Sequence, residues 1–442
     1  MHPRKLCPSA VGRPPGLPRR GAARRSRGHP LRHHALGRGR ALLPDQQSPL
    51  DRRDRHRPRP PRLPLDGRSS AHRAAAALPL RQRAGAQPGR VPLQPARRSG
   101  AGRSSGTGRP IAVTTGTRNG ARPLITVLGA TGFIGSAVMT RLARREVRLR
   151  AVARRPAARP IGALADTEVV TADLMDRDAL AAAVHGSDAV VHLLLCEGGW
   201  RAADQPGGER VNVGVMRDLV EVLRPVRGAA GAPPIVVYGG AASQVGVPPR
   251  EPLDGTETDR PATVYDRQKT AAERVLKDAT EAGWVRGVSL RLPTVFGEGA
   301  TPGTADRGVV AAMVRRALAG EPITMWHDGT VRRDLVHIAD VAAAFAVALD
   351  HPDGLVGNHW LLGAGRGDAL GDVFRMVARS VADRTGTAPV PVTSVEPPSD
   401  APETDFRSVT IDSAPFRSVT GWRPLVPLRE GLDRTVAALA GT

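Results

Sequence analysis

The sequence from residue 123 to residue 442 predicts an α/β fold, a doubly wound parallel sheet with helices on both faces. A glycine-rich turn at 129–135 stands between an apolar strand pattern and a helical pattern. Further strand patterns alternate with helical patterns through five strands, as a parallel sheet requires. This part of the chain is long enough for one large α/β domain with a smaller lobe.

The first predicted strand, LITVL at 124–128, leads directly into the glycine-rich turn. Gly129 permits the turn, Gly132 lets backbone N–H groups approach a pyrophosphate, and Gly135 lets the following helix pack on the strand. The N-terminus of that helix carries partial positive charge, which favours phosphate. Glycine turns without a ligand also follow strands, but this context favours a dinucleotide site. Its predicted residues are Gly129, Thr131, Gly132, Phe133, Ile134 and Gly135.

The second predicted strand, at 147–153, is followed by Arg154 and Arg155. In dinucleotide folds an acidic residue at this point binds the ribose 2′-hydroxyl of NAD, and the sequence offers no carboxylate nearby. Guanidinium groups instead suit a 2′-phosphate, both as charge and as bidentate donors. We therefore predict NADP(H) in preference to NAD(H). The alternative is that both arginines are ordinary surface charges.

The elements that complete the predicted sheet are strands at 168–171, 188–196 and 234–238, with helices at 176–184 and 211–223 between them. Asp176 is expected to cap the first of these helices. The apolar run at 188–196 is typical of a strand covered on both faces. His192 within it is predicted to be a hydrogen-bonded core histidine, and Asn212 to reach the carboxyl edge of the sheet.

The predicted helix at 261–282 carries Tyr265 and Lys269, which are four residues apart and project from one face. A free tyrosine has a pKa of about 10, too high to exchange protons readily at neutral pH. The ammonium of Lys269 and a positively charged nicotinamide are expected to lower the pKa of Tyr265. Tyr265 can then give a proton to a carbonyl oxygen as hydride reaches the carbon, while Lys269 holds the nicotinamide ribose. Chance also places two polar residues four apart in helices.

These motifs resemble those of the extended short-chain dehydrogenase/reductases, which act mostly on nucleotide-linked sugars. The resemblance runs from about Leu124 to Ala440, and its motifs are GATGFIG at 129–135, Asp173 with Leu174, His192, Asn212, Tyr265 with Lys269, RLPTVFG at 291–297 and RRDLVHIADVA at 332–342. More closely, the chain is similar to the TDP-4-keto-6-deoxyhexose 4-ketoreductases of actinomycete antibiotic pathways. The stretches that carry this likeness are RGVVAAMVRRALAGEP at 307–322, TMWHDG at 324–329, DFRS at 405–408 and TGWRP at 420–424.

The resemblance implies an NADP-binding Rossmann domain at 123–296 and a smaller lobe, mainly 297–442, that binds the nucleotide sugar. It implies that Arg333 contacts the diphosphate and that Pro293 lies against the nicotinamide. Arg307 and Trp326 are expected in the substrate site. The remaining implied cofactor contacts are Asp173, Leu174, Leu193 and Asn212. A homodimer is also expected.

The serine or threonine that the family places beside its catalytic tyrosine is missing here. Counting back from Gly246, that position is Ala241, and Ser243 lies two residues further along. We predict that Ser243 is catalytic and comes within hydrogen-bonding reach of the substrate ketone. The alternatives are that water replaces the missing hydroxyl or that Tyr265 acts alone.

Residues 1–122 form a basic segment unlike the rest of the chain. They contain 28 of the 64 Lys and Arg residues, 4 of the 42 acidic residues and no Phe, Trp or Tyr. We predict a disordered Arg/Pro/Gly-rich extension, because so little apolar surface cannot offset the entropy of ordering. A targeting peptide fits poorly, since no apolar core follows the arginine pairs. A non-specific nucleic-acid-binding arm is an alternative. The composition favours a segment that is not a natural part of the protein, because frame-shifted or upstream translation of GC-rich DNA yields Arg, Pro, Ala and Gly in this way.

The sequence contains two cysteines, Cys7 and Cys196, in different regions, and no histidine pairing typical of a metal site. No apolar run is long enough for a membrane span. We therefore predict a metal-free cytoplasmic enzyme with no membrane and no specific nucleic-acid partner. The expected reaction is NADPH-dependent reduction of the 4-keto group of a TDP-4-keto-6-deoxyhexose. A nucleotide-sugar epimerase or dehydratase, or a non-catalytic NADP(H)-binding sensor, is the alternative.

Overall fold

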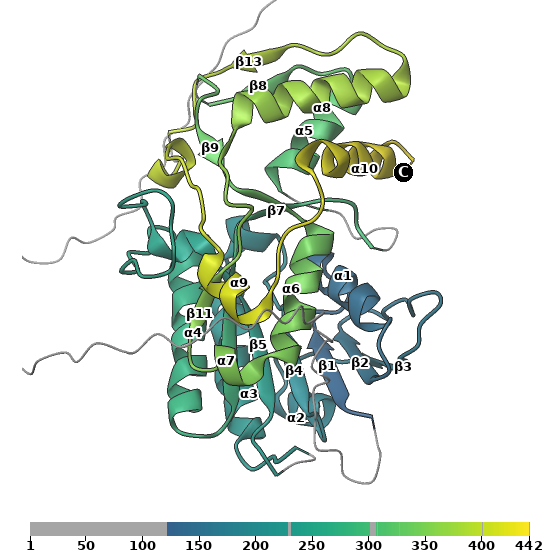
Figure 1. The fold of residues 1–442 in the computed structure, drawn as a ribbon, viewed down its shortest axis with the longest axis vertical. Helices are drawn as coiled ribbons and strands as arrows, with labels where there is room; N and C mark the ends of the chain where they lie inside the picture. Colours follow the sequence, from purple (N-terminus) through teal and green to yellow (C-terminus); the bar gives the residue numbers. More distant parts are fainter. Residues whose placement is uncertain are drawn as a thin grey trace, which may run out of the picture. The chain divides into compact units, whose positions relative to one another are not determined.

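The computed structural model describes residues 122–228, 231–300, 306, 308–326, 328–399 and 401–441. The extension predicted at 1–122 lies outside these residues, except for Arg122. The centre of the described part is a seven-stranded parallel sheet (Figure 1). Its strands, in spatial order, are β11 (His359–Leu361), β6 (Arg286–Leu292), β5 (Ile235–Ala241), β4 (Ala189–His192), β1 (Leu124–Leu128), β2 (Arg148–Ala153) and β3 (Asp166–Thr171). The predicted doubly wound α/β sheet is confirmed, and β6 and β11 extend the five predicted strands.

The strand order reverses at β1. From β1 the chain adds β2 and β3 on one side and then returns to add β4, β5 and β6 on the other. Strand β1 is buried along its whole length, and Ile125 pairs with Leu149 of β2 on one side and with Ala189 of β4 on the other. In an open parallel sheet, the crevice outside the carboxyl ends of the strands at such a reversal is where ligands bind.

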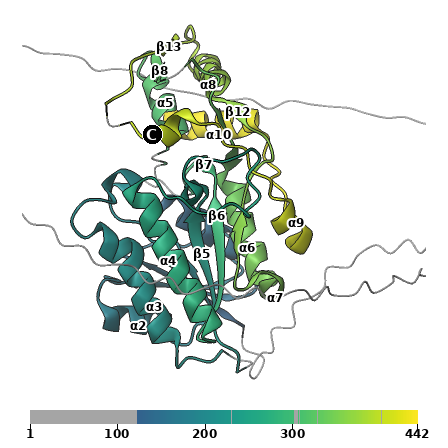
Figure 2. The same cartoon turned by 90° about the vertical axis from the view of Figure 1, so that its left-hand side faces the viewer.

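Helices cover both faces of the sheet (Figure 2). Helices α1 (Phe133–Leu142) and α6 (Ile338–Asp350) pack together in the apolar core of one face. The core of the other face contains α2 (Arg177–Val184), α3 (Val215–Leu223) and α4 (Val264–Glu281). None of the helices in the described part of the chain is long and apolar enough to cross a membrane.

Two predicted elements differ from the observed ones in ways that matter for function. The fourth strand ends at His192, so the apolar residues after it leave the sheet and become a loop. The predicted helix at 211–223 starts with a π-helical turn, η3 (Arg210–Gly214), before α3 begins. Single π-helical turns often occur at functional sites. The predicted cap of α2 is confirmed, because the Asp176 side chain accepts hydrogen bonds from the first free N–H groups of the helix.

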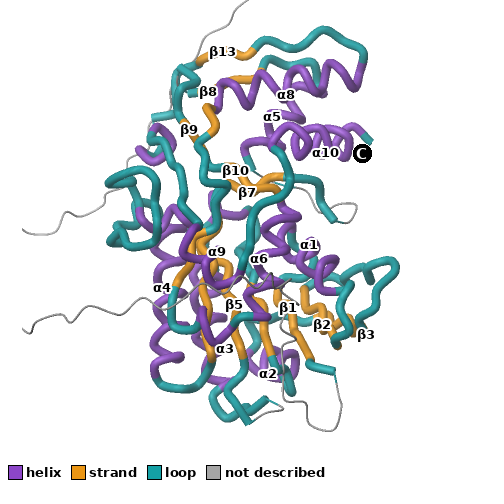
Figure 3. The backbone as a smooth tube through the Cα atoms, in the orientation of Figure 1, coloured by secondary structure: helices purple, strands orange, loops and turns teal. Residues whose placement is uncertain are grey.

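A smaller lobe follows the sheet along the chain. Its helices α5 (Val309–Leu318), α8 (Leu370–Thr385) and α10 (Leu428–Ala440) share one apolar core. A short parallel pair, β8 (Ile323–Met325) with β13 (Val392–Ser394), flanks them (Figure 3). These elements form the C-terminal lobe that the sequence predicts.

The chain passes between sheet and lobe more than once. Helix α6 and strand β11 both follow residue 296, yet they pack on and extend the sheet. The connecting segments pair as β7 (Thr294–Phe296) with β10 (Leu335–His337), and as β9 (Arg332–Arg333) with β12 (Asp368–Ala369). Two short helices, α7 (Pro352–Leu355) and α9 (Ala414–Thr420), complete this part. The junction therefore brings residues from distant parts of the sequence to the carboxyl edge of the sheet.

Candidate active site

A cavity of about 740 Å³ lies at the carboxyl ends of the sheet strands and reaches the lobe. Its wall is built from the glycine-rich turn, the loops after β2, β3, β4 and β5, the start of α4, and segments of the lobe. The predicted site residues found in this wall are Gly129, Thr131, Gly132, Phe133, Ile134, Gly135, Arg154, Arg155, Asp173, Leu174, Leu193, Ser243, Tyr265, Lys269, Pro293 and Arg333. One cavity therefore brings together most of the residues that the sequence singles out.

Two predicted site residues of the described part are not in the wall, and a third falls outside that part. Asn212 is buried behind it, where its Oδ1 accepts a hydrogen bond from the backbone N–H of Cys196 at 2.9 Å. Its amide nitrogen donates to Gln268 Oε1 at 2.7 Å, so Asn212 positions the loop after β4. Trp326 follows β8 in the lobe and does not line the cavity. Arg307 lies outside the described residues.

The glycine-rich turn is shaped so that side chains would not fit in it. Gly129 has a φ of +85°, and a Cβ there would lie 2.9 Å from the carbonyl oxygen of Leu193. A Cβ on Gly135 would lie 2.1 Å from the carbonyl oxygen of Gly129. Helix α1 therefore packs directly against the turn, and its N-cap, Gly132, offers no capping side chain. The first N–H groups of α1 are left available for a phosphate, as a dinucleotide cradle requires.

The two arginines after β2 have a carboxylate beside them that the sequence does not reveal. Arg154 Nη2 lies 3.2 Å from Glu197 Oε2, and Glu197 comes from the loop after β4. The sequence around β2 gives no sign of this carboxylate, because the contact joins residues 43 apart in sequence. Both side chains are more than half exposed, so the pair contributes little stability in water.

The start of α4 places Tyr265 and Lys269 in the cavity wall. Thr263 and Asp266 form a capping box: the Thr263 hydroxyl accepts from Asp266 N–H at 3.1 Å, and Asp266 Oδ2 accepts from Thr263 N–H at 3.2 Å. Tyr265 is thus in the first turn of the helix and Lys269 one turn later. The ammonium of Lys269 donates to the Gly239 carbonyl at 2.7 Å and lies 5.8 Å from the ring centroid of Tyr265.

The surroundings shift the pKa values of the two groups in opposite directions. Burial lowers the pKa of Lys269 to about 8, although Cys196 opposes that shift. Burial raises the pKa of Tyr265, and Asp266 and Cys196 raise it further. The prediction of a lowered Tyr265 pKa is therefore wrong for the protein alone, because desolvation of the phenolate outweighs the distant ammonium.

Ser243 lies in η4 (Ala242–Val245), the short turn after β5, and shares the cavity wall with Ala241. Its hydroxyl donates to Asp266 Oδ1 at 2.5 Å. The turn itself is held by Gln244, whose Oε1 accepts from Ala241 N–H at 2.9 Å. Ser243 therefore lies in the cavity wall with its hydroxyl bonded to Asp266 at the start of α4.

His192 is not the hydrogen-bonded core residue that the sequence predicts. It is fully buried in β4 between Leu128 of β1 and Tyr238 of β5. Neither ring nitrogen has a hydrogen-bond partner among the described residues, and neither does the hydroxyl of Tyr238. Burial, with a further contribution from Lys269, lowers the pKa of His192 to about 3, so the ring is neutral. The His192 ring packs between neighbouring strands and lies edge-on to the Tyr238 ring, with 5.5 Å between the two ring centroids. This packing explains why its ring nitrogens have no hydrogen-bond partner in the described part of the chain.

A buried ionic network, of which the sequence gives no local sign, lies behind the loop after β5. Arg291, only 2% exposed, forms two hydrogen bonds with Asp259 at 2.7 and 2.6 Å and one with Glu273 Oε1 at 2.7 Å. Burial opposes the ionisation of Glu273, but Arg291 and Lys277 lower its pKa to about 2. Glu273 also accepts a bond from Gln244, at 3.3 Å. The network therefore supports the turn that carries Ser243.

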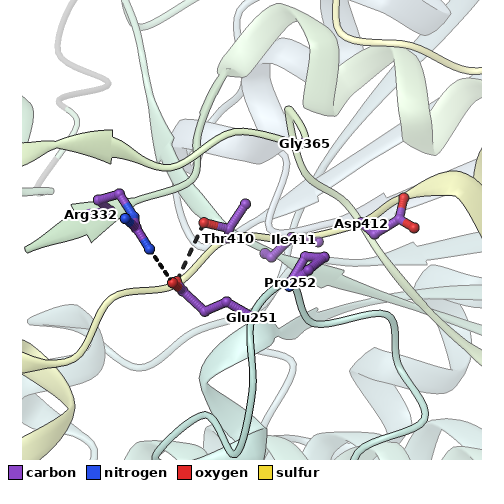
Figure 4. Close-up of a pocket in the computed structure, with 7 residues that line it drawn as sticks. All are labelled: Glu251, Pro252, Arg332, Gly365, Thr410, Ile411 and Asp412. Carbon is purple, nitrogen blue, oxygen red and sulfur yellow. Dashed lines mark hydrogen bonds and ion pairs between the residues drawn. The ribbon is translucent and has the colours of Figure 1, made fainter.

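A second cavity, of about 300 Å³, lies near β9 and contains neither Tyr265 nor Lys269 in its wall. Figure 4 shows Arg332 and Thr410 approaching the carboxylate of Glu251 in this cavity. Arg332 Nη2 lies 2.5 Å from Glu251 Oε2, so this charge is already paired. Among the residues that the structure describes, no group of three or more His, Cys, Asp or Glu is arranged to hold a metal ion.

The chain matches known proteins along its described part. Residues 125–363 match the model of the NAD dependent epimerase/dehydratase family. The chain is 30% identical over 315 residues to a dTDP-6-deoxy-L-talose 4-dehydrogenase (NAD(P)(+)) of Kitasatospora kifunensis, covering 70% of this chain and 93% of that one. It is 28% identical over 347 residues to a dTDP-L-rhamnose 4-epimerase of Burkholderia thailandensis, covering 70% and 92%. The solved structure of MoeE5 in complex with UDP-glucose and NAD has a TM-score of 0.59 and 26% identity, over 72% of this chain and 98% of that one.

Proposed function

Because this chain belongs to the NAD dependent epimerase/dehydratase family, we propose that it is an NADPH-dependent 4-ketoreductase of a TDP-4-keto-6-deoxyhexose. The observation that carries the proposal is the placement of Tyr265 and Lys269 in the wall of one cavity with the glycine-rich turn. A proton donor and a dinucleotide cradle in one cavity are what ketone reduction requires. The Kitasatospora relative supports this substrate class, since its name describes a dehydrogenase acting at carbon 4 of a dTDP-deoxysugar.

The residues present fit a dinucleotide. The turn at Gly129 and Gly135 leaves room only for backbone, and the start of α1 offers free N–H groups. Arg154 and Arg155 stand at the end of β2, where a 2′-phosphate would lie. When bound, NADPH supplies the hydride. Lys269 would hold the ribose, and Leu193 and Pro293 would lie against the nicotinamide.

Tyr265 would give its proton to the ketone oxygen. Tyr265 is protonated at neutral pH, which is the state that a donor needs. Burial makes its phenol a weaker acid, but the alkoxide that forms as hydride arrives is basic enough to take the proton. Ser243 would turn its hydroxyl from Asp266 to the same oxygen when substrate binds. Loss of such a donor typically costs about 3 kcal/mol in the transition state. Turnover of Ser243→Ala with saturating NADPH tests this role, and unchanged turnover would leave Tyr265 as the sole donor.

A 4-epimerase that retains NAD is the second candidate, and Glu197 is the observation that favours it. A carboxylate at the ribose end of the cavity suits the 2′-hydroxyl of NAD and disfavours a 2′-phosphate. The Burkholderia relative is named as an epimerase. One observation speaks against this candidate: Glu197 is paired with Arg154, and Arg154 could bind a 2′-phosphate in place of Glu197.

One experiment separates the candidates. The protein is mixed with NADPH and a panel of TDP-4-keto-6-deoxyhexoses, and NADPH absorbance and the NMR spectrum of the sugar are followed together. A ketoreductase consumes one NADPH for each 4-hydroxy sugar formed. An epimerised sugar without net NADPH consumption would identify the second candidate, and NADPH binding with no change in any sugar would indicate a sensor.

The cofactor preference is tested separately with Glu197→Gln and with the double variant Arg154→Ala, Arg155→Ala. Removing the carboxylate should tighten NADPH binding while leaving NADH binding nearly unchanged. Removing both arginines should weaken NADPH binding far more than NADH binding. Equal effects of either variant on both cofactors would show that these residues are surface charges and would remove the argument for NADPH.

A further inference from the structure

The loop after β4 is held at both ends by two buried amide side chains. Asn212 accepts from the N–H of Cys196 at 2.9 Å, and Gln268 donates to the carbonyl of Ala203 at 2.8 Å. Asn212 and Gln268 also bond to each other at 2.7 Å. We call the segment between these anchors, residues 197–202, the β4 turn. The anchors fix where the β4 turn stands relative to α4 and the cavity.

The β4 turn presents a guanidinium to the cavity. It contains η2 (Gly199–Ala202), and the positive φ of Gly198 and Gly199 sets its bend. Trp200 and Arg201 both line the cavity and are exposed to it. The Arg201 guanidinium stacks on Trp200, with Cζ 4.2 Å from the ring centroid. Within the part of the chain that the structure describes, Arg201 forms no ion pair, so the stacked cation keeps its N–H groups for a ligand.

The Arg333 guanidinium is largely occupied by the protein. Its Nη1 donates to the carbonyls of Arg332 and Arg407, and its Nη2 to those of Thr404 and Asp405. A guanidinium has about five N–H donors in all. Only one therefore remains for a substrate, which is too few to satisfy the oxygens of a diphosphate.

Arg201 and Arg333 both act on Asp405, which lines the same cavity. Asp405 belongs to η5 (Glu403–Phe406), the turn whose carbonyls Arg333 holds. Burial raises the pKa of Asp405, and the charges of Arg333 and Arg201 oppose that rise. Asp405 thus connects the charges of Arg201 and Arg333 at the lobe end of the cavity.

We propose that Arg201 is a second diphosphate-binding residue, which clamps the nucleotide sugar together with Arg333. This inference rests on the proposed function, because it assigns part of the substrate to a cavity whose chemistry that proposal describes. The diphosphate belongs to the sugar nucleotide, since the pyrophosphate of a dinucleotide has its own cradle at the start of α1. Trp200 serves to hold the guanidinium in place rather than to contact the phosphate.

The test measures binding of TDP and of NADPH by calorimetry, to the full chain and to Arg201→Gln. We expect the variant to bind TDP about tenfold or more weakly, as loss of a charge-assisted hydrogen bond implies, and to bind NADPH unchanged. Arg201→Lys keeps the positive charge but loses the bidentate donor geometry of the guanidinium, so its TDP affinity should lie between those of the unaltered chain and Arg201→Gln. Arg227→Gln is the matched control, because Arg227 follows α3 near the amino end of β5, away from the cavity wall.

Each other result overturns the proposal. Equal TDP binding by Arg201→Gln and the unaltered chain would show that Arg201 is a solvated surface charge. Loss of NADPH affinity alongside TDP affinity would assign Arg201 to the cofactor. If the unaltered chain binds NADPH but no TDP, the proposed substrate class fails and this inference fails with it. If the unaltered chain binds TDP and Arg201→Gln binds it equally well, only this inference fails.

Discussion

Tyr265 and Lys269 owe their protonation states to the same enclosure. Removing water from a charged group disfavours its charged form, so burial raises the pKa of the phenol and lowers that of the ammonium. Near neutral pH, Tyr265 therefore retains its proton while Lys269 is still mostly charged. That combination suits the reductive direction, in which the tyrosine donates and the lysine holds an electron-rich ligand.

The lowered pKa of Lys269 predicts a loss of activity at mildly alkaline pH. Because that pKa is about 8, the ammonium is present below this value and is lost as the pH rises through it. We expect kcat/KM for ketone reduction to fall along a limb centred near pH 8. The measurement is a pH profile of the unaltered chain and of Lys269→Arg, whose guanidinium stays charged throughout. The same limb in both proteins would assign the titration to another group.

Tyr265→Phe provides the sharpest test of the proton donor. General acid catalysis typically contributes about 100-fold or more, so turnover should fall by at least that factor while NADPH binding is retained. The chain offers a matched control in Tyr238, its only other tyrosine. The Tyr238 hydroxyl is buried and has no hydrogen-bond partner among the described residues, so Tyr238→Phe should keep turnover within a few-fold. Similar losses in both variants would point to a structural effect.

At the scale of elements, sequence patterns correctly predicted the features that depend on residues close together in the chain. The apolar strand at 124–128 has the predicted bounds, because a run of buried residues is a pattern of only a few neighbouring positions. The capping side chain of Asp176 is likewise a contact over two or three residues. Tyr265 and Lys269 could be singled out for the same reason, since helical spacing alone puts them on one face.

What the sequence did not show depends on contacts between distant residues. The carboxylate of Glu197 reaches Arg154 across 43 residues, and Arg291 reaches Asp259 across 32. The strand and helix periodicities in the sequence do not reveal such pairs, because these contacts form only once the strands are assembled in the sheet. The end of β4 illustrates the point: a continuous apolar run predicted a strand to Cys196, but the strand ends at His192, level with the end of β1 at Leu128.

The glycine-rich turn gives the clearest prediction at the scale of an element. A Cβ at Gly135 would lie 2.1 Å from a backbone oxygen of the turn, whereas a Cβ at Gly132 would lie 3.2 Å from the same oxygen. Gly135→Ala must therefore push α1 away from β1, and should lower the melting temperature and abolish NADPH binding. In Gly132→Ala the neighbouring backbone needs to shift by only a few tenths of an ångström, so this variant should keep the fold while its NADPH binding weakens. Equal behaviour of the two variants would contradict this account of the turn.

At the scale of the whole molecule, charge divides the chain. The described part carries most of the acidic residues, and from residue 123 onward acidic and basic residues are nearly balanced in number, whereas 1–122 holds 28 of the 64 basic residues and only 4 of the 42 acidic ones. All the site residues discussed above lie beyond residue 122. A net charge of +22 for the full chain therefore says nothing about the cavity, although it favours non-specific attraction to polyanions.

Removing the basic segment tests this division. A chain that begins at Val113 should show the same melting temperature, the same NADPH affinity and the same turnover as the full chain, because the sheet, the lobe and the cavity wall all lie after that point. The full chain should retain duplex DNA on a column at low salt and release it as salt rises, since such binding comes from exchange of counterions, and the shortened chain should not retain it. Aggregation or lost turnover of the shortened chain would mean that the segment contributes to the folded enzyme. Retention of DNA by the shortened chain would instead place a nucleic-acid-binding surface on the part that contains the active site.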